Sequence, residues 1–308
     1  MPNSTPGVIV TFFPDVDFPA RVVAIASQVT PLLIIDNTTD PAARERVRRI
    51  AANLGAEYLP QPSNRGIGAA LNIGFANLRA RGFSAAVVFD QDSTPQPGCA
   101  SALVSCAADD DNQAVVGSNW FDEVRPNHRA RHLTPHPWLP LIFRRVEAIQ
   151  EDLSSVTFVI TSGSWFNLKI WHSLGGFDET LFLDLVDVDY CLRVRLLRRT
   201  VAVATAAHLA HNRGNKRPVR FLGHTWWPAF MPPDRLAGLT TNRMRLILRY
   251  GWRRPHWVIY EIVHTAKILW DVISLEDSKL RKLLAMGKGF LNGFIRTQES
   301  GLGPRVDH

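Results

Sequence analysis

The sequence lacks several features that define common protein classes. Only three cysteines occur among the 308 residues, Cys99, Cys106 and Cys191, and their spacing is not that of a metal site. We therefore expect reduced thiols, as in a cytoplasmic protein, and no disulfide framework. The N-terminus has neither the basic nor the apolar region of a signal peptide. No stretch approaches the ~20 apolar residues of a membrane-spanning helix, so any membrane contact is expected to be peripheral.

Familiar nucleotide-binding loops are also missing. The chain has no Gly-x-Gly-x-x-Gly turn, which disfavours a nicotinamide-dependent reductase. The glycine spacing of a P-loop is absent too. The Gly-rich triphosphate loop that nucleotidyltransferases carry near the N-terminus does not occur either, which makes that class a weaker alternative.

The composition is that of a folded, basic protein. Hydrophobic residues make up 46% of the chain and charged residues 20%, enough apolar material for a sizeable core. The net charge of +7, from 35 Lys and Arg against 28 Asp and Glu, favours anionic partners. Nucleotide-sugars, nucleic acid and an anionic membrane surface all fit this charge, which does not choose among them.

The first ninety residues alternate between strand and helix patterns. Short apolar runs bounded by turn residues predict strands, and longer amphipathic runs predict helices. We expect strands over 8–13, 31–35, 57–59 and 85–89, and helices over 18–28, 40–54 and 69–81. This spacing predicts right-handed βαβ units and a parallel sheet. Further strands are expected over 114–117, 157–161 and 201–205.

Two carboxylates follow the strand that ends at Phe89. Asp90 and Asp92 are separated only by Gln91, so their charges repel each other unless a cation or a proton lies between them. Ligands gather at the carboxyl ends of strands in open α/β sheets, and hard divalent cations prefer carboxylate oxygens. On its own the motif fits a simple turn better, because Asp and Ser are common turn residues.

Two further polar segments lie next to predicted strands near the N-terminus. Asp36 follows the second strand, where a carboxylate can accept hydrogen bonds from a nucleobase or a ribose, or can cap a turn. The run from Asn64 to Asn72 has small residues at the start of a helix, where backbone amides can bind phosphate. A helix start with small residues for packing explains the same run.

Two more polar segments occur in the second half. Asp184, Asp187 and Asp189 lie among Leu and Val, where one carboxylate suits a general base. The dipole of a helix N-terminus explains one of these acids more readily than all three. His208 and His211 follow the strand predicted over 201–205, and an imidazole there can complete a metal shell of oxygen and nitrogen ligands.

The composition changes after about residue 220, which predicts a catalytic domain over 1–220 and a helical extension over 221–308. Helices are expected over 257–273 and 278–295. The first carries a polar stripe, and the second carries several Lys and Arg on an amphipathic pattern. Tryptophans also gather here, which suits a membrane interface. A helical hairpin packed on the catalytic domain or on a sister subunit is the alternative.

Together these motifs resemble the inverting family 2 glycosyltransferases. The matching segments come in the family's order over roughly residues 7–215. They are 34–37, 64–74, 89–93, 161–164, 175–179 and 186–193. Within the family, the Asp-Gln-Asp-Ser form and the Asn-x-Gly-x-x-x-Ala-Leu-Asn run are similar to bacterial rhamnosyltransferases that build polysaccharides. The resemblance implies the A-type fold for nucleotide-diphospho-sugars: a mixed, mostly parallel sheet flanked by helices, with a helical C-terminal extension.

The resemblance also implies roles for individual residues. Asp187 would be the catalytic base, Asp92 would bind the divalent metal, and His211 would be the distal metal ligand, with His208 as its rival. Val186 departs from the pattern, because many members carry Glu there. The residues implied at the donor are Thr11, Phe12, Asp36, Asn64, Gly66, Asn72, Asp90, Gln91, Ser162 and Gly163.

The implied reaction is a single displacement that inverts the anomeric carbon of a sugar. The donor is expected to be dTDP-L-rhamnose, with a UDP-sugar as the alternative, and the cofactor Mg²⁺ or Mn²⁺. The acceptor is expected to be a glycan or lipid-linked glycan in cell-surface polysaccharide synthesis, handled at the cytoplasmic face of the inner membrane. Nucleic acid is not an expected partner, and the oligomeric state stays open, a homo-oligomer included. A non-enzymatic basic protein that binds membrane or nucleic acid is the competing class.

Overall fold

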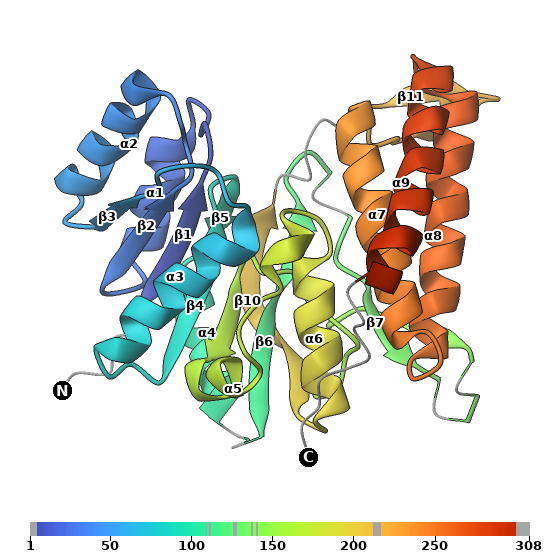
Figure 1. The fold of residues 1–308 in the computed structure, drawn as a ribbon. Helices are drawn as coiled ribbons and strands as arrows, with labels where there is room; N and C mark the ends of the chain where they lie inside the picture. The colour runs from blue at the N-terminus through green and yellow to red at the C-terminus, as the bar shows by residue number, and fades with distance from the viewer. Residues whose placement is uncertain are drawn as a thin grey trace. The chain divides into compact units, whose positions relative to one another are not determined.

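The computed structural model describes residues 5–108, 110, 112–125, 128–136, 138–139, 141–211 and 217–299. The chain divides into two compact units. One, here called the sheet unit, contains residues 1–134 and 145–212, and the other, the helical unit, contains 135–144 and 213–308. The helical unit thus combines the C-terminal part of the chain with the short segment 135–144. Figure 1 shows the elements of each unit along the chain.

The sheet unit alternates strands and helices along its first half. As far as Asp90, its elements are β1 (Gly7–Thr11), α1 (Phe18–Ala26), β2 (Leu32–Asp36), α2 (Pro41–Asn53), β3 (Glu57–Pro60), α3 (Ile67–Ala80) and β4 (Ala85–Asp90). The remaining elements are β5 (Ser93–Pro95), α4 (Cys99–Ala108), β6 (Gln113–Asp122), β9 (Ser164–Asn167), α5 (Leu168–Ser173), the 3-10 turn η1 (Glu179–Leu181), α6 (Val186–Leu196) and β10 (Thr200–His211). β7 (His132–Pro135) and β8 (Phe143–Val146) pair as a separate two-stranded sheet.

One eight-stranded sheet organises this unit, in the order β3-β2-β1-β4-β9-β6-β10-β5. Only β9 and β5 run antiparallel to their neighbours. The predicted mixed, mostly parallel sheet is therefore confirmed. The strand order reverses direction between β1 and β4, which is the position where open α/β sheets bind ligands. The carboxyl ends of β1, β2, β4, β6 and β10 consequently share one edge.

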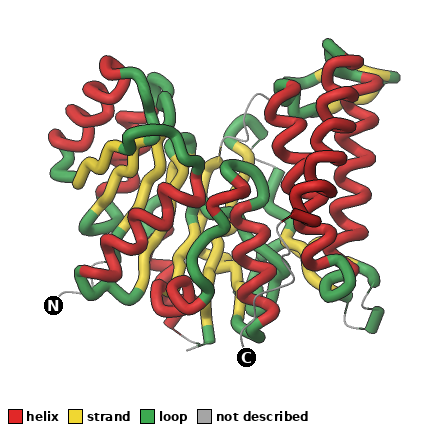
Figure 2. The backbone as a smooth tube through the Cα atoms, viewed as in Figure 1, coloured by secondary structure: helices red, strands yellow, loops and turns green. Residues whose placement is uncertain are grey.

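Helices cover both faces of this sheet (Figure 2). On one face, side chains of α1, α2 and α4 pack with Ile9, Ile34 and Phe89 in a single apolar cluster. On the other face, α3 packs against β1 and β2, and α6 packs against β10. Phe75, Phe166 and their aromatic neighbours fill the second layer. Burial on both faces explains why the central strands read as unbroken apolar runs.

Helix α2 begins where its sequence signals place it. The Asp40 side chain accepts a hydrogen bond of 2.8 Å from the Ala43 amide, and Pro41 occupies the first helical position. This arrangement satisfies an amide that the helix itself leaves unpaired. The predicted start of this helix is confirmed.

The strand predicted over 157–161 is wrong. Residues 157–163 have no regular structure, and the strand β9 begins only at Ser164. β6 is already paired with β9 on one side and with β10 on the other, so no position beside it remains. Val159 is buried by packing against Gly117 of β6, not by pairing with a strand. The apolar residues of this segment reflect its burial. The periodicity of the sequence does not distinguish a buried irregular segment from a buried strand.

The described residues of the helical unit include one helix that the sequence did not suggest. Its elements are β11 (Val219–Phe221), β12 (His224–Trp226), α7 (Pro233–Tyr250), α8 (Pro255–Ser274) and α9 (Lys279–Glu299). Helices α8 and α9 match the two predicted helices, but α7 was not predicted. Thr240 and Thr241 are poor helix formers, yet both are buried and bond back to carbonyls four residues earlier. Among the described residues, no helix combines the length and apolar character needed to cross a bilayer.

Two glycines of α9 allow it to approach α7 closely. A Cβ atom at Gly289 would lie 2.4 Å from the Ala237 carbonyl oxygen, and one at Gly293 would lie 2.6 Å from the Thr241 carbonyl oxygen. The Thr241 hydroxyl also donates to the Gly289 carbonyl at 3.1 Å. Small residues four apart therefore fix which side of α9 faces α7.

We expect Gly289→Ala to destabilise the protein, because the added methyl group forces the two helices apart, at a cost of roughly 1–3 kcal/mol. Gly287→Ala is the matched control: a Cβ there meets nothing within 4 Å. In that variant the better helix propensity of Ala is expected to raise the free energy of unfolding by about 1 kcal/mol at most. Thermal unfolding of the two variants measures both effects, and equal midpoints would contradict the close approach of α7 and α9.

Candidate active site

Several of the predicted site residues lie at the carboxyl edge of the sheet. Thr11 lies opposite Asp36 in the β1–β2 register, and Val10 lies opposite Asp90 across β1 and β4. At the far end, Ser93 of β5 pairs with His211 of β10. Segments that are far apart in the sequence are therefore neighbours in the fold, as parallel strand order predicts.

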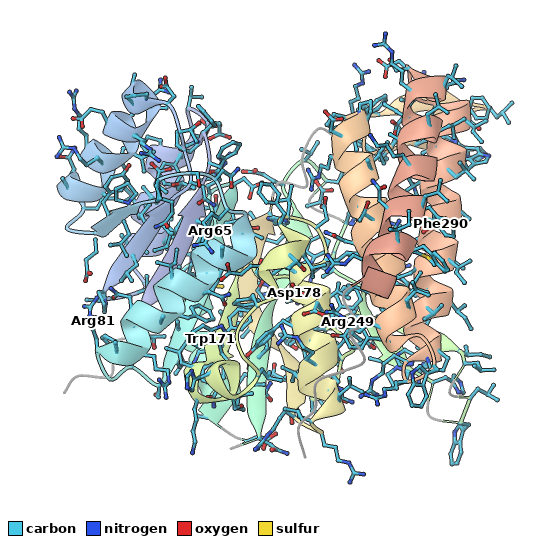
Figure 3. All side chains as sticks on the ribbon, in the orientation of Figure 1. Arg65, Arg81, Trp171, Asp178, Arg249 and Phe290 are labelled. Carbon is cyan, nitrogen blue, oxygen red and sulfur yellow. The ribbon has the colours of Figure 1, made fainter. Side chains whose placement is uncertain are left out.

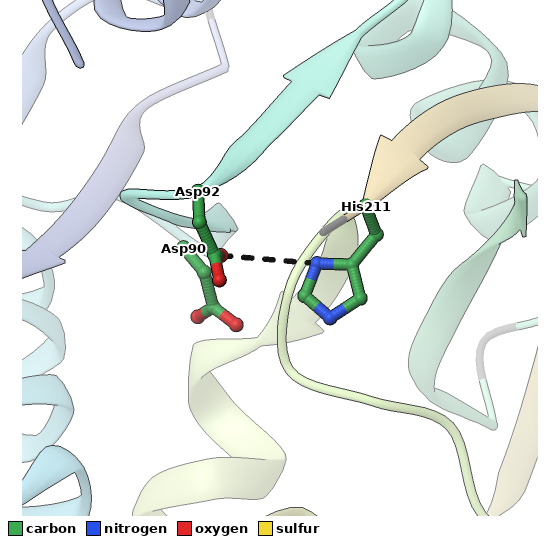
Figure 4. Close-up of side chains that lie close together, drawn as sticks. All are labelled: Asp90, Asp92 and His211. Atoms are coloured by element: carbon green, nitrogen blue, oxygen red, sulfur yellow. Dashed lines mark ion pairs between the residues drawn. The ribbon is translucent and has the colours of Figure 1, made fainter. Parts of the chain in front are cut away.

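Asp90, Asp92 and His211 form a compact cluster (Figure 4). One ligand atom from each of the three lies within 4.8 Å of the others, and His211 Nδ1 is 3.8 Å from Asp92 Oδ1. His208 is not part of this cluster. Residues three apart in a strand point to opposite faces, so only one of the two histidines can point toward the acids.

The cluster suits a divalent cation. Asp92 Oδ1 is buried without a hydrogen-bond partner. Burial raises the pKa of both Asp90 and Asp92, and the charges of Asp92 and Asp187 raise the pKa of Asp90 further. Crowded carboxylates of this kind are stabilised by a cation between them, and two carboxylates with an imidazole are ligands that Mg²⁺ or Mn²⁺ accepts.

Two buried serines connect the backbone of the aspartate motif to His211. The Asp90 amide donates to Ser162 Oγ at 2.9 Å, and the Ser162 hydroxyl donates to Ser93 Oγ at 2.8 Å. Ser93 Oγ is in turn in hydrogen-bond contact with His211 Nδ1 at 2.8 Å. Such a partner fixes the orientation and tautomer of an imidazole that binds a metal.

We therefore expect Ser93→Ala to lower the affinity for Mn²⁺ by about tenfold, because the imidazole loses the group that orients it. Ser164→Ala is the matched control. Ser164 is equally buried, but its hydroxyl donates to the Ile160 carbonyl at 2.6 Å and has no link to His211. Isothermal titration with Mn²⁺ measures both variants, and equal losses would assign the effect to general disturbance of the core.

Asp187 lies in the first turn of α6. It is partly exposed, and its carboxylate is close enough to Asp90 to raise the pKa of that group. Asp189 differs, because it is fully buried and accepts a hydrogen bond of 2.8 Å from Arg193. Asp187 and Asp189 thus lie at a helix start, the position that the helix-dipole alternative assigned to such acids. Asp187 lies outside the cluster of three, but its charge acts on Asp90.

The β1 end carries an exposed aromatic ring beside a buried carboxylate. Asp36 is inaccessible, and its oxygens accept hydrogen bonds from Thr11 and from Tyr58 at 2.9 and 2.7 Å. Phe12 is 45% exposed. The Gln91 side chain bonds both the amide and the carbonyl of Phe12, at 2.7 and 3.1 Å. Gln91 therefore holds the backbone from which the ring projects.

Several of the other predicted donor residues support neighbouring backbone. Asn72 bonds both backbone groups of Phe177, at 2.8 and 3.0 Å. A Cβ at Gly66 would lie 2.2 Å from the Phe182 carbonyl oxygen, and Asn64 accepts from the Gly66 amide at 2.9 Å. These residues position the segment that precedes α6.

Close packing also explains Gly163, where a Cβ would lie 2.6 Å from Ser118 Oγ. This glycine has a φ of +62°, a conformation that other residues adopt rarely.

Sequence reasoning missed Arg21. Its buried guanidinium pairs with Asp15 at 2.7 Å, and its charge acts to lower the pKa of Asp92. A cation therefore lies close to the acids in the folded chain. Arginine on an amphipathic helix normally indicates a solvent-facing side, so no signal in the sequence distinguished this one.

Comparison with known proteins finds a matching family, a related sequence and several similar folds. Residues 17–175 match the family described as glycosyl transferase family 2. The chain is 26% identical over 210 residues to the dTDP-rhamnosyl transferase RfbF of Shigella flexneri, covering 68% of this chain and 69% of that protein.

Three solved structures share the fold at 12% sequence identity. At this sequence identity the similarity shows a shared fold and nothing more. GalNAc-T7 with UDP, GalNAc and Mn²⁺ has a TM-score of 0.59 over 97% of this chain and 58% of its own. PcManGT of Pyrobaculum calidifontis with GDP-Man and Mn²⁺ has a TM-score of 0.55 over 97% of this chain and 88% of its own. Residues 1–349 of S. aureus TarS with UDP-GlcNAc have a TM-score of 0.54 over 96% of this chain and 83% of their own.

Proposed function

Because the chain belongs to glycosyl transferase family 2, we propose that it is a metal-dependent inverting rhamnosyltransferase. The donor is dTDP-L-rhamnose, and the acceptor is a hydroxyl of a glycan or glycolipid in cell-surface polysaccharide synthesis. The observation that carries this proposal is the cluster of Asp90, Asp92 and His211 with Asp187 beside it. The likeness to a dTDP-rhamnosyl transferase supports the choice of donor.

Asp90, Asp92 and His211 would hold Mg²⁺ or Mn²⁺, whose positive charge would stabilise the diphosphate leaving group. Arg21 would add a second positive charge near the same place. Asp187 would accept the proton of the acceptor hydroxyl as its oxygen attacks the anomeric carbon. The bond from that carbon to the diphosphate oxygen breaks in the same displacement, so the configuration inverts through an oxocarbenium-like transition state.

The β1 edge would bind the nucleoside. The exposed ring of Phe12 offers a face on which thymine can stack. Thr11 and the buried Asp36 would shape this pocket from beneath, because the oxygens of Asp36 are already bonded within the protein. We place the enzyme at the cytoplasmic face of the inner membrane, where lipid-linked glycans would be within reach.

A donor panel tests the proposal. The purified protein is incubated with dTDP-L-rhamnose, a UDP-hexose and UDP-galactofuranose, each with Mg²⁺, Mn²⁺ or EDTA, and nucleotide release is measured. We expect release from dTDP-L-rhamnose that EDTA abolishes. Release from a UDP-sugar alone would replace the proposed donor. If DNA or lipid raised the melting temperature while nucleotide-sugars with metal did not, a non-enzymatic binding protein would replace the proposed enzyme.

A further inference from the structure

The rotation of α9 within the helical unit is fixed by its packing on α7. Gly289 and Gly293 lie against α7 carbonyls, and Met286 and Lys282 on the same side are buried. Lys282 is held there by an ion pair of 2.7 Å with the equally buried Glu276. The opposite side of α9 must therefore face away from α7.

That opposite side is apolar and exposed. Its large side chains recur every three or four residues, so they form one continuous stripe along the helix. The stripe consists of residues that are between 43% and 70% exposed: Leu280, Leu284, Phe290, Leu291, Phe294 and Ile295. Figure 3 shows Phe290 on this helix.

Helix α8 carries a second stripe of the same kind. This stripe consists of apolar residues that are between 37% and 57% exposed: Ile259, Ile262, Val263, Leu269, Trp270 and Ile273. The polar stripe predicted for this helix is partly buried: Glu261 and Arg243 of α7 form an ion pair of 2.6 Å with both side chains inaccessible. Exposed apolar surface on this scale marks an interaction site.

Basic side chains flank the α9 stripe. On a helical projection Lys279 lies on one side of it, and Arg281 and Lys288 lie on the other. All three are exposed, and none forms an ion pair with any residue in the described part of the chain. No acidic residue occurs between 279 and 295, so the stripe and its borders carry only positive charge.

Positive charge is concentrated in this part of the chain. Residues 217–295 contain thirteen Lys and Arg against five Asp and Glu, while the whole chain has a net charge of +7. Four of these five acids already pair with Arg243, Lys267 or Lys282. The exposed cations of α9 are therefore available to an external anion.

We propose that the exposed stripes of α8 and α9 form a docking surface for an anionic bilayer. The apolar side chains enter the boundary between headgroups and acyl chains, and Lys279, Arg281 and Lys288 reach the lipid phosphates. A second copy of this chain fits less well, because both surfaces of a twofold interface would carry these cations and the α9 segment 279–295 has no acidic residue to pair with them. The surface extends the proposed membrane location, on which it rests, but it does not depend on the identity of the sugar donor.

Vesicle co-sedimentation tests this surface. The full-length protein is mixed with phosphatidylcholine vesicles, with or without phosphatidylglycerol. We expect binding only to the anionic vesicles, weakened by salt. Leu284→Asp with Leu291→Asp should reduce the bound fraction at least tenfold. Val23→Asp, the same change at an exposed position of α1, should leave it unchanged. Lys279→Glu with Lys288→Glu keeps the apolar stripe and should weaken binding by about fivefold or more per charge.

Three results would overturn the proposal. The first is equal binding of the wild-type protein to neutral and anionic vesicles, and the second is binding to neither. The third is a wild-type dimer in light scattering that the double Asp variant dissociates, without vesicle binding, which would assign the surface to self-association. Nucleotide release from the donor in detergent-free solution is measured in parallel. Its absence with intact vesicle binding would count against the proposed enzyme and not against this surface.

Discussion

Asp187→Asn is expected to lower turnover by about 100-fold or more while leaving donor binding nearly intact. The side chain lies in the first turn of α6, and its charge acts on Asp90; in the proposed reaction the acceptor hydroxyl approaches the sugar here. Asn has nearly the same shape but no basic oxygen that can take a proton. The substitution therefore removes the proton acceptor without altering the donor pocket.

Steady-state rates and donor dissociation constants separate these two effects. Asp184→Asn makes the same chemical change two residues before α6, outside the acid cluster, and should leave turnover close to that of the wild type. A fully active Asp187→Asn variant would remove this residue from the role of base. A variant that loses donor affinity and turnover together would assign it to binding instead.

Asp92→Asn is expected to abolish the stabilisation of the folded protein by Mn²⁺ and to raise the melting temperature of the metal-free protein. Asp92 Oδ1 is buried without a partner, and Asp92 and Asp90 each have a raised pKa because of burial. An amide at this position removes one of the repelling charges, so the metal-free fold gains stability. It also removes a proposed metal ligand, and the resulting loss of Mn²⁺ affinity should exceed the 10–100-fold decrease typical of residues that only orient a ligand.

The burial of Asp90 beside Asp92 also makes the stability of the metal-free protein depend on pH. A carboxyl group whose pKa is raised on folding favours the protonated state, so its contribution to stability is present at low pH and is lost as pH rises through the folded pKa. Between the ordinary aspartate pKa and the raised pKa of Asp90, the metal-free protein therefore loses part of its stability. Mn²⁺ should raise the melting temperature more at pH 8 than at pH 6. An increase that is larger at pH 6 would contradict this sign.

The sheet and its functional edge were predictable because local patterns and connection rules agree there. Buried parallel strands read as continuous apolar runs, and right-handed crossovers place their carboxyl ends together. Asp90 and Asp92 at the end of β4 were therefore located correctly. Spacing in β10 also accounts for His211, and not His208, lying beside them.

Features that depend on tertiary packing were not predictable. Helix α7 buries Thr240, Thr241, Arg243 and Arg245, residues that an amphipathic pattern assigns to the solvent side. The contact of Ser93 with His211 joins positions 118 residues apart, and that of Ser162 with Ser93 joins positions 69 apart. No local signal in a single sequence connects such positions.

Direct titration with Mn²⁺, followed by electron paramagnetic resonance, measures the cation site itself. The wild-type protein should bind one Mn²⁺ per chain, with a spectrum that changes when dTDP is added. Asp92→Asn and His211→Ala should lose this binding, while His208→Ala should keep it. Equal binding by the wild type and by Asp92→Asn, or a loss in His208→Ala with His211→Ala intact, would contradict a cation held by Asp90, Asp92 and His211.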